Sequence, residues 1–222
     1  MLVAAAVLPH PPMLVPAVAA GAAAELDELR DACRRAVRTA AAASPELTYL
    51  LGVDTAPHAS SFAPWGVDEP VDVPEPLPLP LLVGAWLTAG TSRSFVVVAD
   101  ELEPQECAEL GAELAGSAER VAIIAMGDGP ARLSEKAPGY LDDRAAGYDE
   151  AAAAALARAD TEALLGLDPW LSRDLLVAGR APWQVLAGAA ATLGPPLVED
   201  GWHGAPYGVG YHVVTWSWQE NA

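Results

Sequence analysis

Histidine, carboxylate and arginine side chains stand directly after apolar segments of this sequence. His10 follows the first such segment and lies between prolines, and Asp54 and His58 follow the second. Asp128 and Arg132 follow the fourth. Imidazole and carboxylate groups that share a pocket can bind a metal ion or transfer protons. In open α/β sheets ligands bind beyond the carboxyl ends of the strands, so we expect these five side chains to line one pocket.

Each of these residues also has a purely structural interpretation. His10 could orient a turn through hydrogen bonds to its neighbours, and His58 is typical of a solvated loop histidine. Asp128 could cap a helix or turn. Arg132 is either a surface charge or the partner of Asp128 in an ion pair.

The other two histidines are predicted to be structural. His203 stands beside a tryptophan and a glycine and is expected at the surface. His212 alternates with Val214 and Trp216 and is expected to be half-buried on a strand. Asp149, near the start of a predicted helix, is expected to pack that helix.

Strands and helices are predicted to alternate along the chain. Short apolar runs predict strands at residues 2–7, 47–53, 94–99 and 121–126, and an alternating tail predicts another within 207–218. Start and stop signals predict helices at about 22–43, 80–89, 104–115, 145–165, 169–177 and 182–193. This order favours one α/β domain over residues 1–222, with a mainly parallel sheet covered by helices on both faces.

A proline-rich stretch from 57 to 80 interrupts this alternation. It is too dense in proline to form a regular element. It is either a linker or a long loop that covers the end of the sheet, and we favour the loop because both flanks belong to the same alternation.

The composition limits the class of partner. The chain of 222 residues is Ala-rich, and its formal net charge is −18, with no local run of basic residues. This charge disfavours nucleic acid and anionic membranes as partners. Cys33 and Cys107 lie on helical apolar stripes and are expected to be core thiols, which suits a reducing cytoplasm. The apolar start of the chain is interrupted by prolines and is predicted to be a strand rather than a signal peptide.

Four segments, in order, resemble one known family. They read LPHPPMLVP, MGDGPARLSEKAPGY, AGRAPWQVLAGAA and APYGVGYHVVTW. Together they resemble the LigB-like class III extradiol dioxygenases, a group that includes the Memo proteins. The resemblance implies a single α/β domain and a non-haem Fe(II) site of two histidines and a carboxylate. Such a site binds a small catechol-like ligand and O2, and it cleaves the aromatic ring.

The resemblance assigns roles to several residues. His10 and His58 are the candidate metal ligands, and His58 and Asp128 are the candidate catalytic residues. Asp54, Asp128 and Glu199 compete for the third ligand position. The pocket is expected to include His10, Asp54, Asp128 and Arg132.

The sequence also departs from the family pattern. Ala131 stands where the family has its acid–base histidine, and Pro130 stands at the serine before it. Ala178 replaces the cysteine of Memo-like members. We therefore expect Fe(II) binding to be weak or absent.

Three functions stay open on these grounds. The first is a working Fe(II)-dependent ring-cleaving enzyme, and the second is a non-catalytic binding or interaction protein that keeps the fold and pocket. The third is metal-dependent hydrolysis at the same sheet edge. Self-association is compatible with all three. The sequence has no glycine-rich phosphate loop and no Gly-x-Ser-x-Gly elbow.

Overall fold

The apolar runs of the sequence form buried strands of one mixed sheet. The computed structural model describes residues 1–218, apart from the side chain of Asp200, so residues 219–222 of the expected domain lie outside the description. The strands are β1 (Leu2–Leu8), β2 (Leu47–Val53), β3 (Ser94–Val98), β4 (Val121–Met126), β5 (Leu197–Gly204) and β6 (Tyr211–Ser217). The helices are α1 (Pro16–Ala19), α2 (Asp27–Ala42), α3 (Leu79–Leu87), α4 (Pro104–Gly116), α5 (Arg144–Arg158), α6 (Thr161–Leu165), α7 (Pro169–Asp174) and α8 (Arg180–Ala190).

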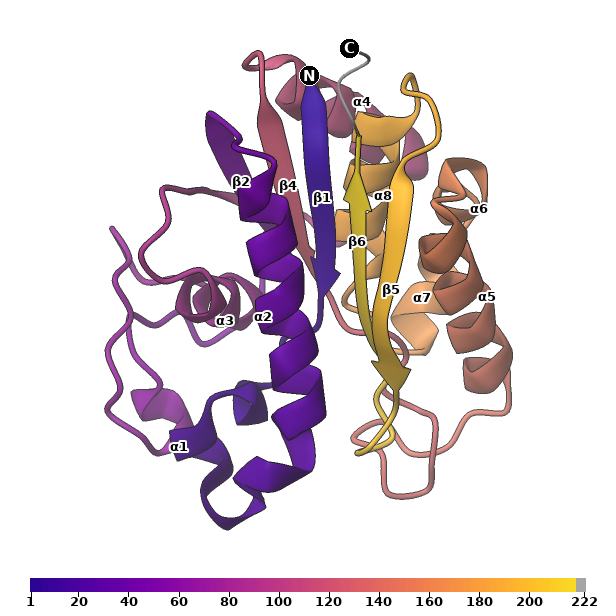
Figure 1. Ribbon diagram of the computed structural model, residues 1–222. Helices are drawn as coiled ribbons and strands as arrows, with labels where there is room; N and C mark the ends of the chain where they lie inside the picture. The colour runs from indigo at the N-terminus through magenta and orange to yellow at the C-terminus, as the bar shows by residue number, and fades with distance from the viewer. Residues whose placement is uncertain (219–222) are drawn as a thin grey trace.

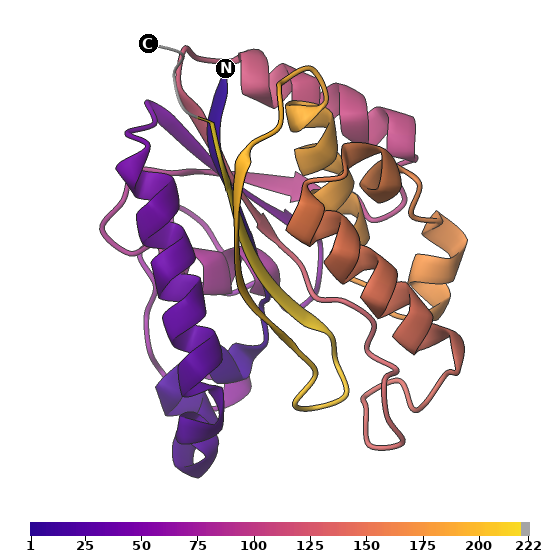
Figure 2. The same ribbon diagram turned by 45° about the vertical axis from the view of Figure 1, so that its right-hand side comes forward.

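The sheet has the order β3-β2-β4-β1-β6-β5. The pairs β3–β2, β2–β4 and β4–β1 are parallel, whereas β6 is antiparallel to β1 and to β5. Helices α2 and α3 cover one face, and α4, α5 and α8 cover the other (Figures 1 and 2). The predicted α/β class, with a mainly parallel sheet between helical layers, is confirmed.

The last two strands form a hairpin with an irregular register. His203 of β5 lies opposite His212 of β6. The register shifts between Asp200 and Trp202, where Gly201 is an extra residue in β5. Such a bulge changes which face the following side chains occupy.

Two predicted helices differ from the structure, and one strand was not predicted. The predicted helix over 145–165 is divided into α5 and α6 at Ala159, which takes a left-handed φ of 50°. Asp160 then starts α6, because its side chain accepts a hydrogen bond from the backbone N–H of Ala163. The predicted helix over 22–43 is regular only from Asp27, after a 3-10 segment at Ala20–Leu26. Strand β5 was not predicted.

The proline-rich stretch packs onto the core as a loop. Phe62 and Leu77 are buried in the same apolar cluster as α3. Ladder bridges join Ala59 to Leu77 and Ser61 to Pro70. These contacts favour the loop interpretation over a linker.

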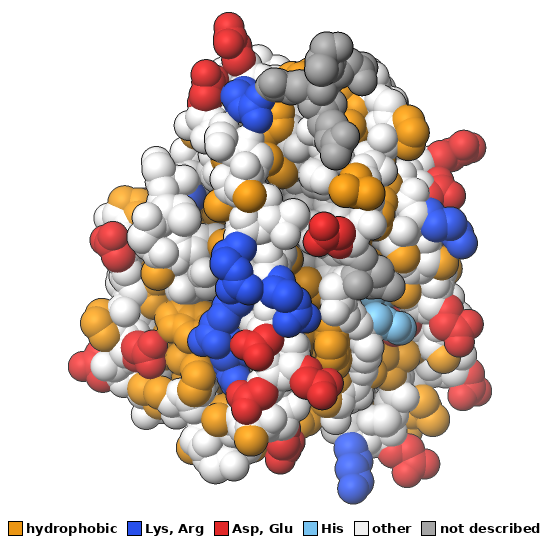
Figure 3. Space-filling model, viewed as in Figure 1, with side chains coloured by type: hydrophobic (Ala, Val, Ile, Leu, Met, Phe, Trp, Pro, Cys, Tyr) orange, Lys and Arg blue, Asp and Glu red, His pale blue; other side chains and the backbone are white. Residues whose placement is uncertain are grey.

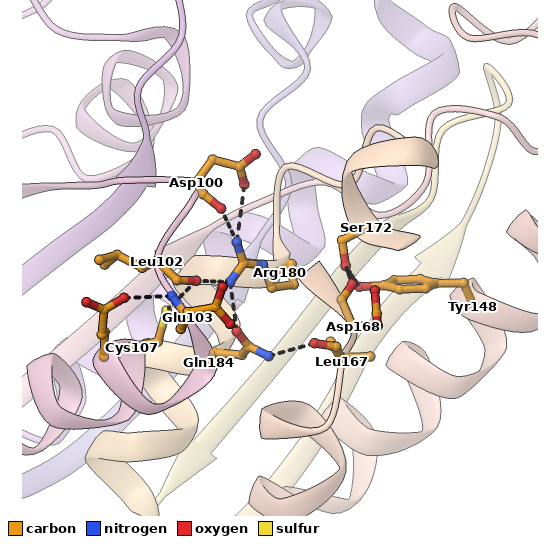
Figure 4. Close-up of polar contacts among 11 residues, drawn as sticks. Asp100, Leu102, Glu103, Cys107, Tyr148, Leu167, Asp168, Ser172, Arg180 and Gln184 are labelled. Carbon is orange, nitrogen blue, oxygen red and sulfur yellow. Dashed lines mark hydrogen bonds and ion pairs between the residues drawn. The ribbon is translucent and has the colours of Figure 1, made fainter. Parts of the chain in front are cut away.

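A buried arginine ties α8 to its surroundings (Figure 4). Arg180, the first residue of α8, is almost inaccessible to solvent and donates hydrogen bonds to the carbonyl oxygens of Asp100 and Leu102. It also donates to Oε1 of Gln184 at 3.0 Å. Gln184 in turn donates to the carbonyl oxygens of Leu164 and Leu167. One cation therefore holds the β3–α4 connection, α8 and the end of α6 together.

Within residues 1–218, no helix combines the length and the apolar character needed to cross a membrane.

Candidate functional site

His10 and Asp128 meet where β1 and β4 end. Leu8 of β1 and Met126 of β4 lie side by side in the parallel register. His10 stands two residues after Leu8, and Asp128 stands two residues after Met126. The backbone N–H of His10 donates to Oδ1 of Asp128 at 2.8 Å, and Nδ1 of His10 lies 3.4 Å from the same oxygen. The parallel register thus brings together two residues 118 positions apart.

This pair is almost entirely enclosed. His10 is buried, and the Asp128 side chain is 15% exposed. Burial raises the pKa of Asp128, and the nearby His10 opposes that rise. Nδ1 of His10 has no hydrogen-bond partner. The pair therefore combines a carboxyl group that releases its proton less readily than usual with an unpartnered imidazole nitrogen.

Asp54 and His58 form a second pair, at the end of β2. Nε2 of His58 lies 2.6 Å from Oδ1 of Asp54, and these side chains are 47% and 60% exposed, respectively. Among the described residues no hydrogen bond or ion pair joins this pair to His10 or Asp128. The structure therefore gives two separate His–Asp pairs.

The Fe(II) site implied by the resemblance does not fit these side chains. Neither His10 nor His58 belongs to a group of three close ligand atoms among the described His, Cys, Asp and Glu residues. A facial iron site needs all three ligands. No catalytic step through iron follows from this geometry.

Arg132 does not pair with Asp128 among the described residues. Its Nε is buried without a hydrogen-bond partner, its side chain packs beside Gly139, and its charge acts on Asp142. Ala131 is held by its backbone, since its N–H donates to the carbonyl of Leu175 at 3.0 Å.

Glu199 lies in β5 beside a basic helix. Glu199 lies opposite Thr215 in the register of β5 and β6. It lines a groove together with Arg35 and Arg38 of α2. Figure 3 shows basic side chains gathered over α2. This basic surface is local in the sequence as well, because four arginines lie within nine residues of α2: Arg30, Arg34, Arg35 and Arg38.

A third cluster was missed by sequence reasoning: Asp149, His203 and His212. Nε2 of His212 lies 3.0 Å from Oδ1 of Asp149, and Nε2 of His203 lies 3.1 Å from Oδ2. The two imidazole rings are stacked, with centroids 4.8 Å apart and planes 7° apart. The side chains of Asp149, His212 and His203 are 8%, 2% and 42% exposed, respectively. One carboxylate thus bridges a buried and an accessible histidine.

Glycines leave room for this carboxylate. A Cβ on Gly129 would lie 2.7 Å from Oδ1 of Asp149 and 3.0 Å from Nε2 of His212, and a Cβ on Gly210 would overlap Oδ1. The Trp183 ring packs against His212 in a T-shaped arrangement, with an interplanar angle of 85°. Because Gly129 follows Asp128 directly, the cluster and the His10–Asp128 pair are connected through one short loop.

The charge balance favours an ionised Asp149. Burial by itself would raise the pKa of Asp149, but the hydrogen bonds and charges of His212 and His203 outweigh it and lower that pKa. The carboxylate is therefore charged and is oriented by both rings.

A hairpin signal could have revealed the two histidines. Residues 203 and 212 lie at equal distances on either side of the turn at residues 207–208, as cross-strand partners do. No sequence signal places Asp149 beside them, because that contact depends on how α5 packs on the sheet.

Comparisons with known proteins show the fold alone. No protein-family model matches the sequence, and no curated protein is similar to it. A crystal structure of the uncharacterized protein JW3007 from Escherichia coli K12 is similar, with a TM-score of 0.58 and 14% sequence identity. The match covers 97% of this chain and 100% of that one.

Proposed function

We propose that this chain is a LigB-like, dioxygenase-related protein that binds a small phenolic ligand beside His10 and Asp128 and does not cleave it. The contact between these two residues carries the proposal. They come from two of the four segments on which the family resemblance rests, and those segments meet at the carboxyl ends of β1 and β4. Ligands of open α/β sheets bind at this edge.

The pair has the chemistry to recognise a hydroxyl group. A phenolic hydroxyl both donates and accepts hydrogen bonds. The carboxyl oxygens of Asp128, one of which lies beside His10, can accept a hydrogen bond from such a hydroxyl. Nδ1 of His10, which has no hydrogen-bond partner, supplies a second polar contact. Satisfying that buried nitrogen would itself favour binding.

Two features of the chain argue against catalysis. The residue aligned with the family's acid–base histidine is Ala131, which cannot transfer a proton. Acid–base groups typically contribute about 100- to 10,000-fold to rate. In addition, His10 and His58 lack a third metal ligand among the described side chains. A cytoplasmic location is part of the proposal, because Cys33 and Cys107 are free thiols.

Calorimetric titration with catechol and phenol tests the binding. We expect Asp128→Asn to weaken binding by about tenfold, the loss of one hydrogen bond to a charged group. Asp54→Asn is the matched control, since Asp54 also pairs with a histidine at the sheet edge but is exposed. Equal affinity of wild type and Asp128→Asn would refute the proposed site.

Oxygen consumption tests the absence of ring cleavage. With Fe(II) and a panel of catechols, we expect no turnover above the protein-free rate. Ala131→His should not restore it, because the ligand set is incomplete as well. Rapid oxygen uptake by the wild type would show that the chain is a working dioxygenase.

A further inference from the structure

We propose that Asp149, His203 and His212 form a binding site for a divalent transition-metal ion such as Zn²⁺. This site is separate from the His10–Asp128 pair and does not depend on the proposed phenol binding. Its ligand atoms all lie within 4.8 Å of one another.

The donor set selects the class of ion. Two imidazole nitrogens and one carboxylate oxygen suit Zn²⁺, Fe²⁺, Co²⁺ and Ni²⁺, whereas Ca²⁺ and Mg²⁺ prefer sites made of oxygen alone. Nε2 of His212 lies 3.0 Å from Oδ1 of Asp149, and Nε2 of His203 lies 3.1 Å from Oδ2 of the same carboxylate. Both separations are close to the roughly 3.3 Å between ligand atoms of a tetrahedral zinc ion with bonds near 2.0 Å. Three protein ligands would leave one position for water.

Two of the three ligands are already held in place. The carboxylate of Asp149 rests against the Cβ-free backbone of Gly129 and Gly210. The ring of His212 is only 2% exposed and packs against the Trp183 ring at an interplanar angle of 85°. Ordering these side chains therefore costs little further entropy when an ion binds.

The third ligand provides access. His203 is 42% exposed and lines a surface pocket of about 220 Å³. The α5 side of this pocket consists of Ala153, Ala154 and Ala157, whose small side chains leave space for water on the ion. An ion can thus reach the cluster from solvent without unfolding.

Binding requires one local adjustment. Imidazole ligates a metal in the plane of its ring, and stacked rings 7° from parallel cannot both contain the same ion in their planes. His203, the exposed ring, would turn while His212 and Asp149 keep their positions. Both Nε2 atoms would then present lone pairs to the ion, with the ring protons on Nδ1.

The Asp54–His58 pair provides a matched control within the same chain. It also joins an exposed histidine to a carboxylate, but it has no third ligand atom nearby among the described residues. If exposed histidines alone captured the ion, His58 would bind as well as His203.

Metal titration of EDTA-treated full-length protein tests the proposal. Co²⁺ is followed by its visible absorption bands and Zn²⁺ by calorimetry, and we expect one ion per chain. His203→Ala should weaken binding by about 100-fold or more, since even second-shell changes at metal sites cost about 10- to 100-fold. His58→Ala should leave the affinity unchanged.

Several results would overturn the site. They are no saturable binding by wild type, equal affinity in His203→Ala, or loss of binding in His58→Ala. His203 is accessible, so its alanine variant should retain the circular dichroism of the wild type. Shifts of the His203 and His212 imidazole NMR signals on adding Zn²⁺ provide a second readout. Phenol binding should be the same in His203→Ala, so the two proposals fail separately.

Discussion

Gly111 of α4 lies directly against the backbone of Val185 in α8. A Cβ on Gly111 would overlap the carbonyl oxygen of Val185 and crowd the N–H of Ala189 at 2.6 Å. The two helices therefore touch backbone to backbone, and no side chain can yield at this point. This contact sets the spacing of the helical layer that covers one face of the sheet (Figure 2).

Gly111→Ala is expected to destabilise the protein by about 1–3 kcal/mol, the usual cost of overpacking. Alanine would gain up to about 1 kcal/mol of helix propensity, which offsets only part of that cost. Urea unfolding followed by circular dichroism measures the change.

Gly147→Ala in α5 is the control for this substitution. A Cβ at Gly147 would meet no atom within 4 Å. The same change should therefore stabilise the protein, by up to about 1 kcal/mol. If both variants shifted stability in the same direction, the close α4–α8 contact would not be the cause.

Arg180→Met is expected to lower the free energy of unfolding by about 3 kcal/mol or more. The substitution keeps much of the buried volume but leaves the carbonyl oxygens of Asp100 and Leu102 without their donor (Figure 4). Each unsatisfied buried acceptor costs about 1–3 kcal/mol. Chemical denaturation of the variant measures the loss.

Arg180→Lys distinguishes the geometry of the guanidinium from its charge. A lysine keeps the charge but lacks the planar fork that reaches several acceptors at once. We expect it to recover less than half of the lost stability. Full recovery would mean that charge alone, and not the fork, holds α8 in place.

Stability is expected to fall as the pH rises above about 9. Burial raises the pKa of the Cys33 thiol from its ordinary value of 9.0 to about 12, and that of Cys107 to about 11. Both groups then ionise in the unfolded chain at a lower pH than in the folded one. The two buried thiols make their full contribution to the free energy of unfolding below pH 9, and this contribution is lost as the pH rises towards 11–12. Urea unfolding at pH 8, 9.5 and 10.5 measures the decline.

Cys33→Ala should make this decline shallower, because the variant has one thiol fewer to ionise on unfolding. In parallel, a thiol reagent at pH 8 should react slowly with the native wild type and fully after denaturation. Rapid labelling of the folded protein would contradict the burial that underlies the prediction.

The parallel part of the fold was predictable because its signals are local. Strands β1, β2 and β4 are short apolar runs, and their common direction follows from the helices between them. The contact of His10 with Asp128 follows from this parallel arrangement, because the two residues come two positions after Leu8 and Met126, which are paired in the sheet. The break between α5 and α6 was not predictable, because Ala159 adopts a left-handed conformation without the glycine that usually announces one.

The Asp149 cluster could not be predicted because it depends on three separate placements. Strand β5 has polar residues and a bulge, which obscure its alternation. His203 and His212 lie opposite each other only because of the hairpin register. Asp149 belongs to a helix about 60 residues earlier in the chain. Only the packed structure supplies all three.

The extra residue in β5 gives the hairpin one position that it can lose without losing its register. Without Gly201, the pairs Glu199–Thr215, Asp200–Val214, Trp202–Val213 and His203–His212 would follow one another in an uninterrupted ladder. Side chains alternate along a regular strand, so His203 would stay on the face that carries Asp149. Loss of a single codon at this position would thus remove only the bulge and keep the three ligands together.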